Sequence, residues 1–313
     1  MCDYTIFYKE CYDKDNLKNV PKYDVFYSAF DNSERTKGTF NSVKAKKKKW
    51  FIFPQYQYNS DNLPEEETIY KKDSCYEVEY FNEFMNDFSY SSKNAICMDI
   101  TGFIRPHLMY LLHFFWRSNI GKIDLLYSEP LLYREAEDTK FSGYIEKCQN
   151  IEGFSSNYDS NVENDLLIIC AGYDDKLITK VVQEKQHCKN KYYIFGFPSL
   201  QPNMYQENVL NMYKKRELTG ERKIKFAPAY DPFVTAQVIE EIIKECPSAK
   251  NVYLSPLSTK PQTVGMALYY IMNFKKRNVN MIFPYSNTYS PEHTIGIKRT
   301  WKYTIEFPKW NGI

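Results

Sequence analysis

The sequence predicts an α/β protein with doubly wound, mainly parallel, Rossmann-like sheet structure in two similar halves. Short apolar runs alternate with helical segments along nearly the whole chain, an order typical of βαβ crossovers. Most of these runs are continuous rather than alternating, as expected for strands covered on both faces. In addition, two strand-to-helix junctions, residues 95–112 and 251–271, share one order of residue types.

The elements follow from these patterns in chain order. We expect strands at 4–8, 24–30, 50–53, 95–99, 123–127, 165–171, 191–197, 224–226, 251–254 and 280–283, and helices at 34–45, 76–88, 106–116, 176–184, 203–215, 232–245 and 261–275. The helix 232–245 is the most clearly marked, because Asp231 is suited to cap it and Pro232 to begin it. Residues 300–307 alternate between apolar and polar types and predict an antiparallel edge strand.

A polar, aperiodic segment at 149–164 marks the expected boundary between the halves. It divides the chain into a Rossmann-like N-terminal half, 1–150, and a Rossmann-like C-terminal half, 151–313, which would include the edge strand. Residues 55–74 are too many for a tight turn and are expected to cross the surface or form a lid.

Composition excludes some classes of protein. The 41 basic and 39 acidic residues leave a net charge of +2, which argues against a protein that coats nucleic acid by bulk charge. The basic run 44–49 is expected to be a solvated helix end, with a docking patch for an acidic partner as the alternative. No run of 18 apolar residues is present, so no membrane association is expected.

The eight cysteines have neither CxxC nor Cys/His ligand spacing, so we predict no metal site, reduced thiols and a cytoplasmic location. The N-terminus does not have the pattern of a signal peptide. Neither a Gly-rich dinucleotide fingerprint nor a Walker sequence occurs, so no cofactor can be named.

The two similar junctions predict anion seats. Each runs from an apolar strand through small and hydroxyl residues to a base and a proline, Arg105-Pro106 or Lys260-Pro261, and then into an apolar helix. The first helical turn presents free amides and the positive end of the helix dipole beside the cationic side chain. Phosphate is the usual ligand of such a turn, so a nucleotide-like ligand is expected.

Other polar residues follow the predicted strands at their carboxyl ends, where open parallel sheets bind ligands. We expect one rim to hold them. The predicted ligand-binding residues are Ser28, Arg35, Thr101, Gly102, Arg105, Ser258, Thr259 and Lys260. Gly102 would let the backbone approach a ligand, and Arg105 would bind phosphate through its guanidinium fork.

Three carboxylates on this rim are candidate catalysts: Glu129, Asp99 and Asp31. Glu129 precedes a proline at the expected tip of a strand, where partial burial would raise its pKa and suit it to act as a base or nucleophile. Each carboxylate also has a structural alternative, because Asp31, Asp99 and Glu129 could cap helices instead.

The junctions DITGFIRPHLMYLL and SPLSTKPQTVGMALYY resemble the strand-to-helix turns of the CARF and SAVED superfamily, Rossmann-like sensors of cyclic oligonucleotides in prokaryotic antiviral defence. Ser258, Thr259, Lys260 and Pro261 carry the resemblance. It implies that this turn holds ligand phosphate and that the protein is a dimer. The first junction has Phe103, Ile104 and Arg105 where the second has its Thr-Lys pair.

Three functions follow from these observations. The first is a cytosolic protein of antiviral defence or signalling that binds a nucleotide or oligonucleotide through its basic turns, alone, as a homodimer or with a protein partner. The second is an enzyme, a hydrolase or glycosidase of nucleotide-like substrates that uses the strand-end carboxylates. The third is an interaction subunit of a larger complex.

Overall fold

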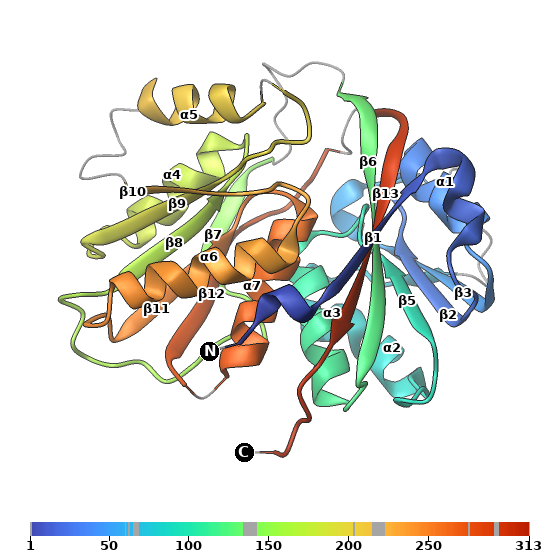
Figure 1. Ribbon diagram of the computed structural model, residues 1–313, viewed down its shortest axis with the longest axis horizontal. Coiled ribbons are helices and arrows are strands. Elements are labelled where there is room, and N and C mark those ends of the chain that lie inside the picture. Colours follow the sequence, from blue (N-terminus) through green and yellow to red (C-terminus); the bar gives the residue numbers. More distant parts are fainter. Residues whose placement is uncertain are drawn as a thin grey trace. The chain divides into compact units, whose positions relative to one another are not determined.

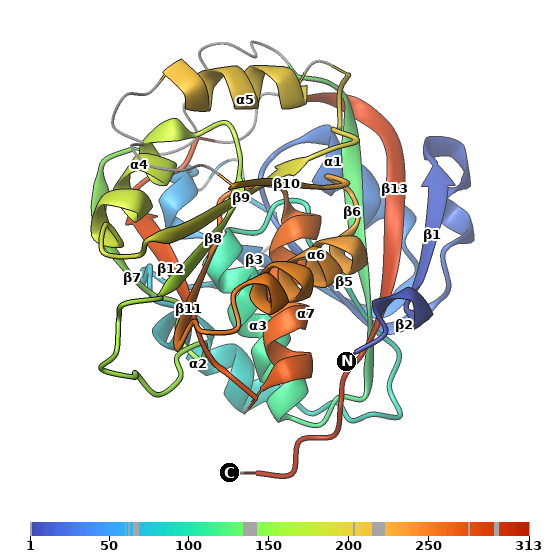
Figure 2. The same ribbon diagram turned by 60° about the vertical axis from the view of Figure 1, so that its left-hand side comes forward.

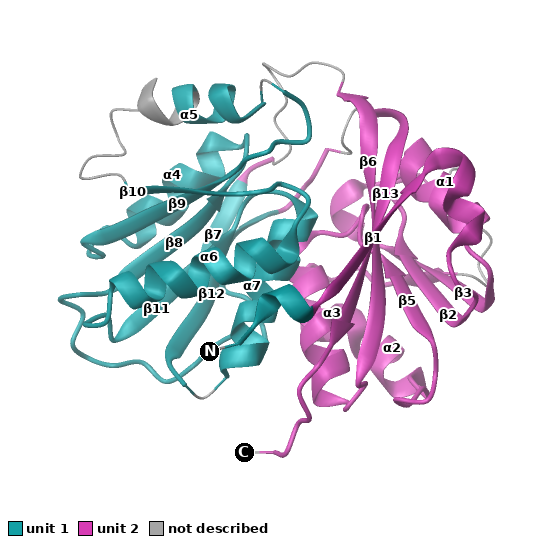
Figure 3. Ribbon diagram, viewed as in Figure 1, with its two compact units in different colours: residues 1–6, 145–286 teal, residues 7–144, 287–313 magenta. Residues whose placement is uncertain are grey.

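The chain folds into two compact units. The computed structural model describes residues 2–59, 61, 63–64, 69–133, 143–202, 204–214, 223–274, 276–290 and 294–312. Unit 1 comprises residues 1–6 and 145–286, and unit 2 comprises residues 7–144 and 287–313 (Figure 3). The chain therefore passes between the units after residues 6, 144 and 286.

Unit 2 contains a seven-stranded sheet with the order β1-β13-β6-β5-β2-β3-β4 (Figure 1). Its strands are β1 (Tyr8–Asp13), β2 (Tyr23–Ala29), β3 (Ala45–Ile52), β4 (Ile69–Lys71), β5 (Ile96–Asp99), β6 (Lys122–Tyr133) and β13 (Thr294–Glu306), and its α-helices are α1 (Glu34–Ser42), α2 (Glu77–Asp87) and α3 (Arg105–Arg117). Short 3-10 turns are η2 (Lys14–Asn19) and η3 (Pro54–Tyr56). The strands from β6 to β4 are parallel, whereas β13 and β1 are antiparallel to their neighbours.

Unit 1 contains a six-stranded sheet with the order β10-β9-β8-β11-β12-β7. Its elements are η1 (Tyr4–Ile6), β7 (Ile145–Asn150), β8 (Leu166–Ala171), α4 (Asp175–Glu184), β9 (Asn190–Gly196), α5 (Met204–Lys214), β10 (Lys223–Ala227), α6 (Pro232–Glu245), β11 (Asn251–Pro256), α7 (Lys260–Asn273) and β12 (Asn278–Ser286). Only β7 is antiparallel to its neighbour. Helices α6 and α7 pack side by side (Figure 2).

The two sheets share one topology, which confirms the predicted fold class. In unit 2 the chain runs outward from β2 through β3 to β4, then returns to the other side of β2 to form β5 and β6. Unit 1 repeats this path with β8, β9, β10, β11 and β12. In each sheet the last parallel strand pairs with an antiparallel one, β6 with β13 and β12 with β7. Because parallel crossovers are right-handed, this reversal places helices on both faces of each sheet. The two similar junctions of the sequence are β5–α3 and β11–α7, the corresponding crossovers.

The C-terminal strand differs from its prediction. We expected an edge strand in the C-terminal half, but β13 lies inside the seven-stranded sheet of unit 2, between β1 and β6. Its pairing with β6 extends from Thr294 opposite Tyr133 to Glu306 opposite Lys122. This long antiparallel ladder satisfies backbone groups that the edge of β6 would otherwise leave open, and the domain boundary at 150/151 therefore misses the return of the last residues to unit 2.

The interior of unit 2 is aromatic, as the 28 Tyr and 21 Phe of the chain suggest. The Phe51 ring lies 5.2 Å from Phe81, 5.3 Å from Phe84 and 5.7 Å from Phe103, measured between ring centroids. These distances fall in the range favoured by edge-to-face aromatic pairs. Within the described residues, no helix has the length and apolar character needed to span a lipid bilayer.

Candidate functional site

The predicted site residues divide between the two sheets. Open parallel sheets bind ligands beyond the carboxyl ends of the strands, where the strand order reverses. In unit 2 this switch point lies between β2 and β5, and in unit 1 between β8 and β11. The expected single rim is thus two rims: Arg105 follows β5 in unit 2, whereas Ser258, Thr259 and Lys260 follow β11 in unit 1.

The switch point of unit 2 carries a buried, hydrogen-bonded carboxylate. Asp99, the last residue of β5, is 0% exposed. Its Oδ2 accepts a hydrogen bond of 3.0 Å from the Ser28 hydroxyl on β2. Its Oδ1 accepts from the Thr101 amide at 3.0 Å and from the Thr101 hydroxyl at 2.6 Å. Three of the predicted residues, Ser28, Asp99 and Thr101, are therefore in direct contact across the two central strands.

Burial raises the pKa of Asp99 to about 6. The hydrogen bonds from Thr101 and Ser28 oppose this shift because they stabilise the charged form, and the Asp31 carboxylate adds to it. Asp31 is itself buried and accepts from the Ser33 amide at 3.0 Å and the Thr36 hydroxyl at 2.6 Å. The helix α1 is capped by Ser33, not by Asp31. Two carboxylates, one titrating near neutral pH, thus share this switch point.

Three further side chains of this edge carry a buried polar atom without a hydrogen-bond partner. In the described parts of the chain, no partner bonds to Oε1 of Gln55, the hydroxyl of Tyr58 or either ring nitrogen of His107. Gln55 and Tyr58 follow β3, and His107 lies in the first turn of α3, which follows β5. Because β3 and β5 are parallel strands of one sheet, all three side chains lie at the same edge. Buried polar atoms are normally bonded, so this concentration of exceptions calls for an explanation.

The surroundings of these atoms differ. His107 is 1% exposed, and its ring centroid lies 4.7 Å from that of Phe53 and 5.3 Å from that of Tyr80. This apolar burial lowers the pKa of His107 to about 3, so the imidazole is neutral. Tyr58 lies beside Asp31, which adds to the effect of burial in raising the Tyr58 pKa far above its usual value.

Helix α3 begins at the same edge. Its N-cap residue is Ile104, whose side chain has no atom that could accept a hydrogen bond, and Arg105 and Pro106 begin the helix. By contrast, Ser33 caps α1 and Thr259 caps α7 through their hydroxyl groups. The positive end of α3 therefore lies at the edge that carries the carboxylates, and the partly exposed Arg105 is the first residue of the helix.

Glu129 does not occupy the position predicted for a catalyst. Strand β6 continues through Pro130 to Tyr133, so Glu129 lies within the strand rather than at its tip. It is 2% exposed; Oε1 accepts from the Trp301 indole at 2.6 Å, and Oε2 pairs with Arg299 Nε at 3.1 Å. Both oxygens are committed to β13, and the residue joins β6 to that strand.

Arg35 is also structural in this fold. The side chain is 1% exposed, with Nη1 donating to the Ser128 carbonyl at 3.0 Å and Nε to the Thr294 hydroxyl at 3.1 Å. It thereby ties α1 to β6 and β13, whereas the sequence analysis assigned it to a ligand.

A close contact within the protein explains the glycine at position 102, and its predicted role in ligand binding stays a prediction. A Cβ atom at this position would lie 2.2 Å from the carbonyl oxygen of Ala29, at the end of β2. Gly172, which follows β8, would in the same way meet the Leu257 carbonyl at 2.2 Å. Each switch point therefore has a glycine that allows two backbone segments to pack closely. In unit 2 the turn after β5 packs on the end of β2, and in unit 1 the turn after β8 packs on the residues that follow β11.

The basic turn of unit 1 is occupied by its own contacts. The Thr259 hydroxyl accepts from the Gln262 amide at 3.3 Å and donates to the Ala229 carbonyl at 2.5 Å. Lys260 is 8% exposed and Ser258 is 7% exposed. The two basic turns are similarly enclosed, because one residue in each, Thr259 or Arg105, is partly exposed and its neighbours are buried.

Gln55, Tyr58 and His107 are not among the site residues predicted from the sequence. Gln55 and Tyr58 lie in the segment 55–74, which was expected to cross the surface or form a lid. Their position directly after the strand expected at 50–53 was the available signal, because the carboxyl end of that strand also lies at the edge where ligands bind. A scan against models of known protein families and a search of curated proteins gave no match to this chain.

Proposed function

We propose that the protein binds a nucleotide-like small ligand at the switch point of unit 2. One observation carries the proposal: buried polar atoms without partners among the described residues, on Gln55, Tyr58 and His107, gather at the sheet edge that holds Asp31 and Asp99. Leaving such atoms unpaired costs about 1–3 kcal/mol each. A ligand that supplies hydroxyl and amine groups would recover this free energy.

The ligand chemistry follows from the groups present. The Asp31 and Asp99 carboxylates and Gln55 Oε1 accept hydrogen bonds, as ribose hydroxyls and base amines require. The N-terminus of α3 and Arg105 supply positive charge for a phosphate. A phosphorylated nucleoside combines both features. Ser258, Thr259 and Lys260 in unit 1 form a second candidate phosphate seat.

Calorimetric titration with nucleotides and cyclic oligonucleotides tests the proposal. The cyclic compounds belong in the panel because the junctions resemble CARF and SAVED turns, and a role in antiviral defence is part of the proposal. We expect Arg105→Ala to weaken binding of the best ligand at least tenfold, because a charge-assisted contact contributes about 1.5–3 kcal/mol.

Arg117→Ala is the matched control, since Arg117 is the exposed last residue of the same helix. It should leave the affinity unchanged. Loss of binding in Lys260→Ala but not in Arg105→Ala would move the site to unit 1. Failure of every compound to bind would contradict the proposal. Sedimentation with and without ligand tests the homodimer that the resemblance implies.

A second candidate function is hydrolysis of such a ligand with Asp99 as general acid or base. The pKa of about 6 favours it, because a catalyst that titrates near the working pH can both take and give a proton. Turnover of NAD and nucleotides by pure protein is the assay. Asp99→Asn should abolish turnover while retaining ligand binding, whereas Glu129→Gln should act only through stability; an active Asp99→Asn variant excludes this mechanism.

A further inference from the structure

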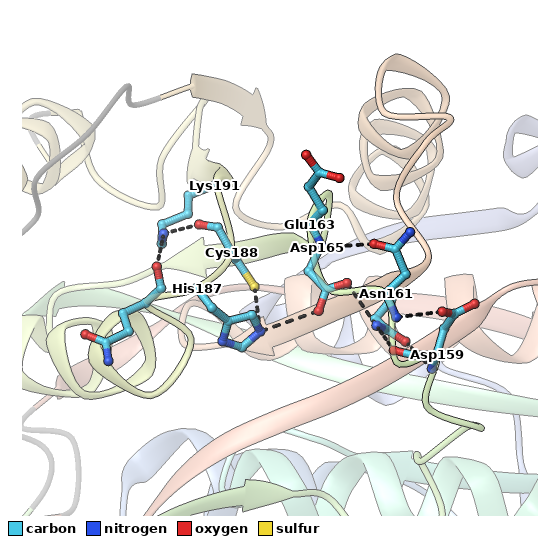
Figure 4. Close-up of polar contacts among 9 residues, drawn as sticks. Asp159, Asn161, Glu163, Asp165, His187, Cys188 and Lys191 are labelled. Carbon is cyan, nitrogen blue, oxygen red and sulfur yellow. Dashed lines mark hydrogen bonds and ion pairs between the residues drawn. The ribbon is translucent and has the colours of Figure 1, made fainter.

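A second cluster of reactive side chains lies in unit 1, at the amino ends of β8 and β9. Asp165 immediately precedes β8, and His187 and Cys188 lie between α4 and β9. The β8–β9 register begins with Leu166 opposite Asn190, which brings Cys188 and its neighbour beside Asp165. Figure 4 shows the three side chains directed toward one another.

The distances suit shared ligation of one small cation. His187 Nε2 lies 3.4 Å from Asp165 Oδ2 and 3.7 Å from Cys188 Sγ, and the three ligand atoms lie within 4.8 Å of one another. Ligand atoms bound to one tetrahedral zinc ion stand roughly 3.3–3.7 Å apart, given metal–ligand bonds of ~2.0–2.3 Å. Only a modest inward movement of Cys188 and Asp165 would complete such a set.

The arrangement lacks the order of a catalytic triad. In a triad the two ring nitrogens of histidine bond to different partners, one to the nucleophile and one to the carboxylate. Here both the Cys188 thiol and the Asp165 carboxylate face the same atom, His187 Nε2. Three donors converging at one point is the geometry of a metal site rather than of a proton relay.

Burial supports the same interpretation. Asp165 and Cys188 are 0% exposed. Within the described residues, Oδ2 of Asp165 makes no hydrogen bond of good geometry, although His187 Nε2 lies 3.4 Å away and the Tyr253 hydroxyl bonds to the carboxylate. Oδ1 accepts a hydrogen bond of 2.9 Å from Asn251 Nδ2. The Asn251 side chain is itself fixed, because it also donates to the Asp159 carbonyl and accepts from the Asp159 amide. Oδ1 is thus held by a fixed partner while Oδ2 is directed to the cluster, as in metal sites whose ligands are oriented by an outer shell.

We propose that Asp165, His187 and Cys188 bind a zinc ion. One thiolate and one carboxylate neutralise its two charges, and the neutral imidazole supplies the third ligand. The Cys188 proton is released to solvent on binding. The His187 side chain is 38% exposed, so water can occupy the fourth position. Lys185 and Lys191 lie near Cys188 and oppose the cation, so both anionic ligands contribute to its affinity.

This site differs from the sequence prediction, which found no ligand spacing. The adjacent pair His187-Cys188 and the distant Asp165 match no local metal motif, and only the pairing of β8 with β9 joins them. The site lies in unit 1 and does not depend on the proposed function in unit 2.

Metal analysis of the full chain tests the proposal. After removal of metal with a chelator and incubation with zinc, we expect one zinc ion per chain. Cobalt(II) should give the thiolate-to-cobalt charge-transfer band of a cysteine ligand. Cys188→Ser should abolish the band and weaken zinc binding at least tenfold, whereas Asp165→Asn should weaken binding but keep the band.

Cys170→Ser is the matched control, because Cys170 is equally buried on β8 and lies outside the cluster. It should keep both the stoichiometry and the band. Should the Cys188 variant fail to fold, His187→Ala changes the exposed ligand of the cluster and should likewise weaken zinc binding at least tenfold. Absence of zinc from wild-type protein, or a band that persists in Cys188→Ser, would overturn the site.

Discussion

His107 is a buried histidine at the proposed site, and neither of its ring nitrogens has a hydrogen-bond partner among the described residues. Both ring nitrogens are buried, and the pKa is lowered to about 3 by desolvation. Between that value and the unfolded value of about 6.5 the native state binds fewer protons than the unfolded state. The free energy of unfolding therefore decreases as the pH falls through this range, by about 1.4 kcal/mol per pH unit.

Replacing His107 by Phe removes the titration and fills the same aromatic surroundings. We expect His107→Phe to recover about 2 kcal/mol of stability at pH 5 relative to pH 8, measured by denaturant unfolding of both proteins. His113, whose pKa is lowered to about 4, gives the same slope in both and cancels in the difference. The variant should also bind the proposed ligand more weakly. Equal pH dependence in the two proteins would contradict the assigned burial.

The effect of Asp99 on the pH dependence of stability is opposite to that of His107. Its native pKa is raised, so its contribution to stability is complete below the unfolded pKa and is lost as the pH rises through about 6. The residue type and position of Asp99, Ser28 and Thr101 were predictable from the end of each apolar strand. Their mutual contacts were not, because they depend on β2 and β5 becoming neighbours through a reversal of strand order.

At the scale of elements, the glycines at the switch points set how closely the central crossovers pack. Gly102→Ala would place Cβ 2.2 Å from the backbone oxygen of Ala29, which cannot rotate away as a side chain could. We expect a loss of at least about 2 kcal/mol, within the range of overpacked sites. Thermal unfolding of the variant measures it.

Gly121→Ala is the control for this substitution. Its Cβ would meet nothing closer than Ser92 Cβ at 3.9 Å, so its effect should stay within about 0.5 kcal/mol. An equal loss in both variants would show that flexibility, not close approach, explains the glycine at 102.

The lysine run shows where element prediction failed. Residues 44–49 were expected to end a helix, but β3 begins at Ala45 and includes four lysines. Local contacts stabilise them: Lys46 pairs with Asp24 at 2.7 Å, and Lys48 donates to the Phe40 carbonyl near the end of α1 at 2.6 Å. Lysine has a low propensity for β-strands, so the local sequence does not predict the first half of β3. Its strand structure depends on the pairing with β2.

At the scale of the whole molecule, most helices could be predicted because each carries its periodicity and start signals in its own sequence. Domain membership could not, because β13 is assigned to unit 2 by pairing with β6, far away in sequence. The short strand β4 and the polar strand β7 also lack a local signal and exist through their neighbours.

The pairing of β6 with β13 predicts that the main segment of unit 1 can fold as an isolated fragment and that the main segment of unit 2 cannot. Residues 145–286 contain every strand of the six-stranded sheet, so this fragment should unfold cooperatively, although loss of the Tyr4–Asn273 hydrogen bond lowers its stability. Residues 7–144 lack β13 and should not fold alone. Circular dichroism melting of both fragments is the measurement, and a cooperative transition in fragment 7–144 would contradict the prediction.

Strand β13 also has a consequence for synthesis on the ribosome. Its first paired residue, Thr294, is translated 161 residues after its partner Tyr133, which takes roughly 8–32 s at about 5–20 residues per second. Throughout that interval strand β6 of the nascent seven-stranded sheet has no partner strand on its β13 side. Unit 1 can therefore finish folding before unit 2, although most of unit 2 is synthesised first. This reverses the usual order of folding during synthesis. The early strands of unit 2 should meanwhile bind chaperones.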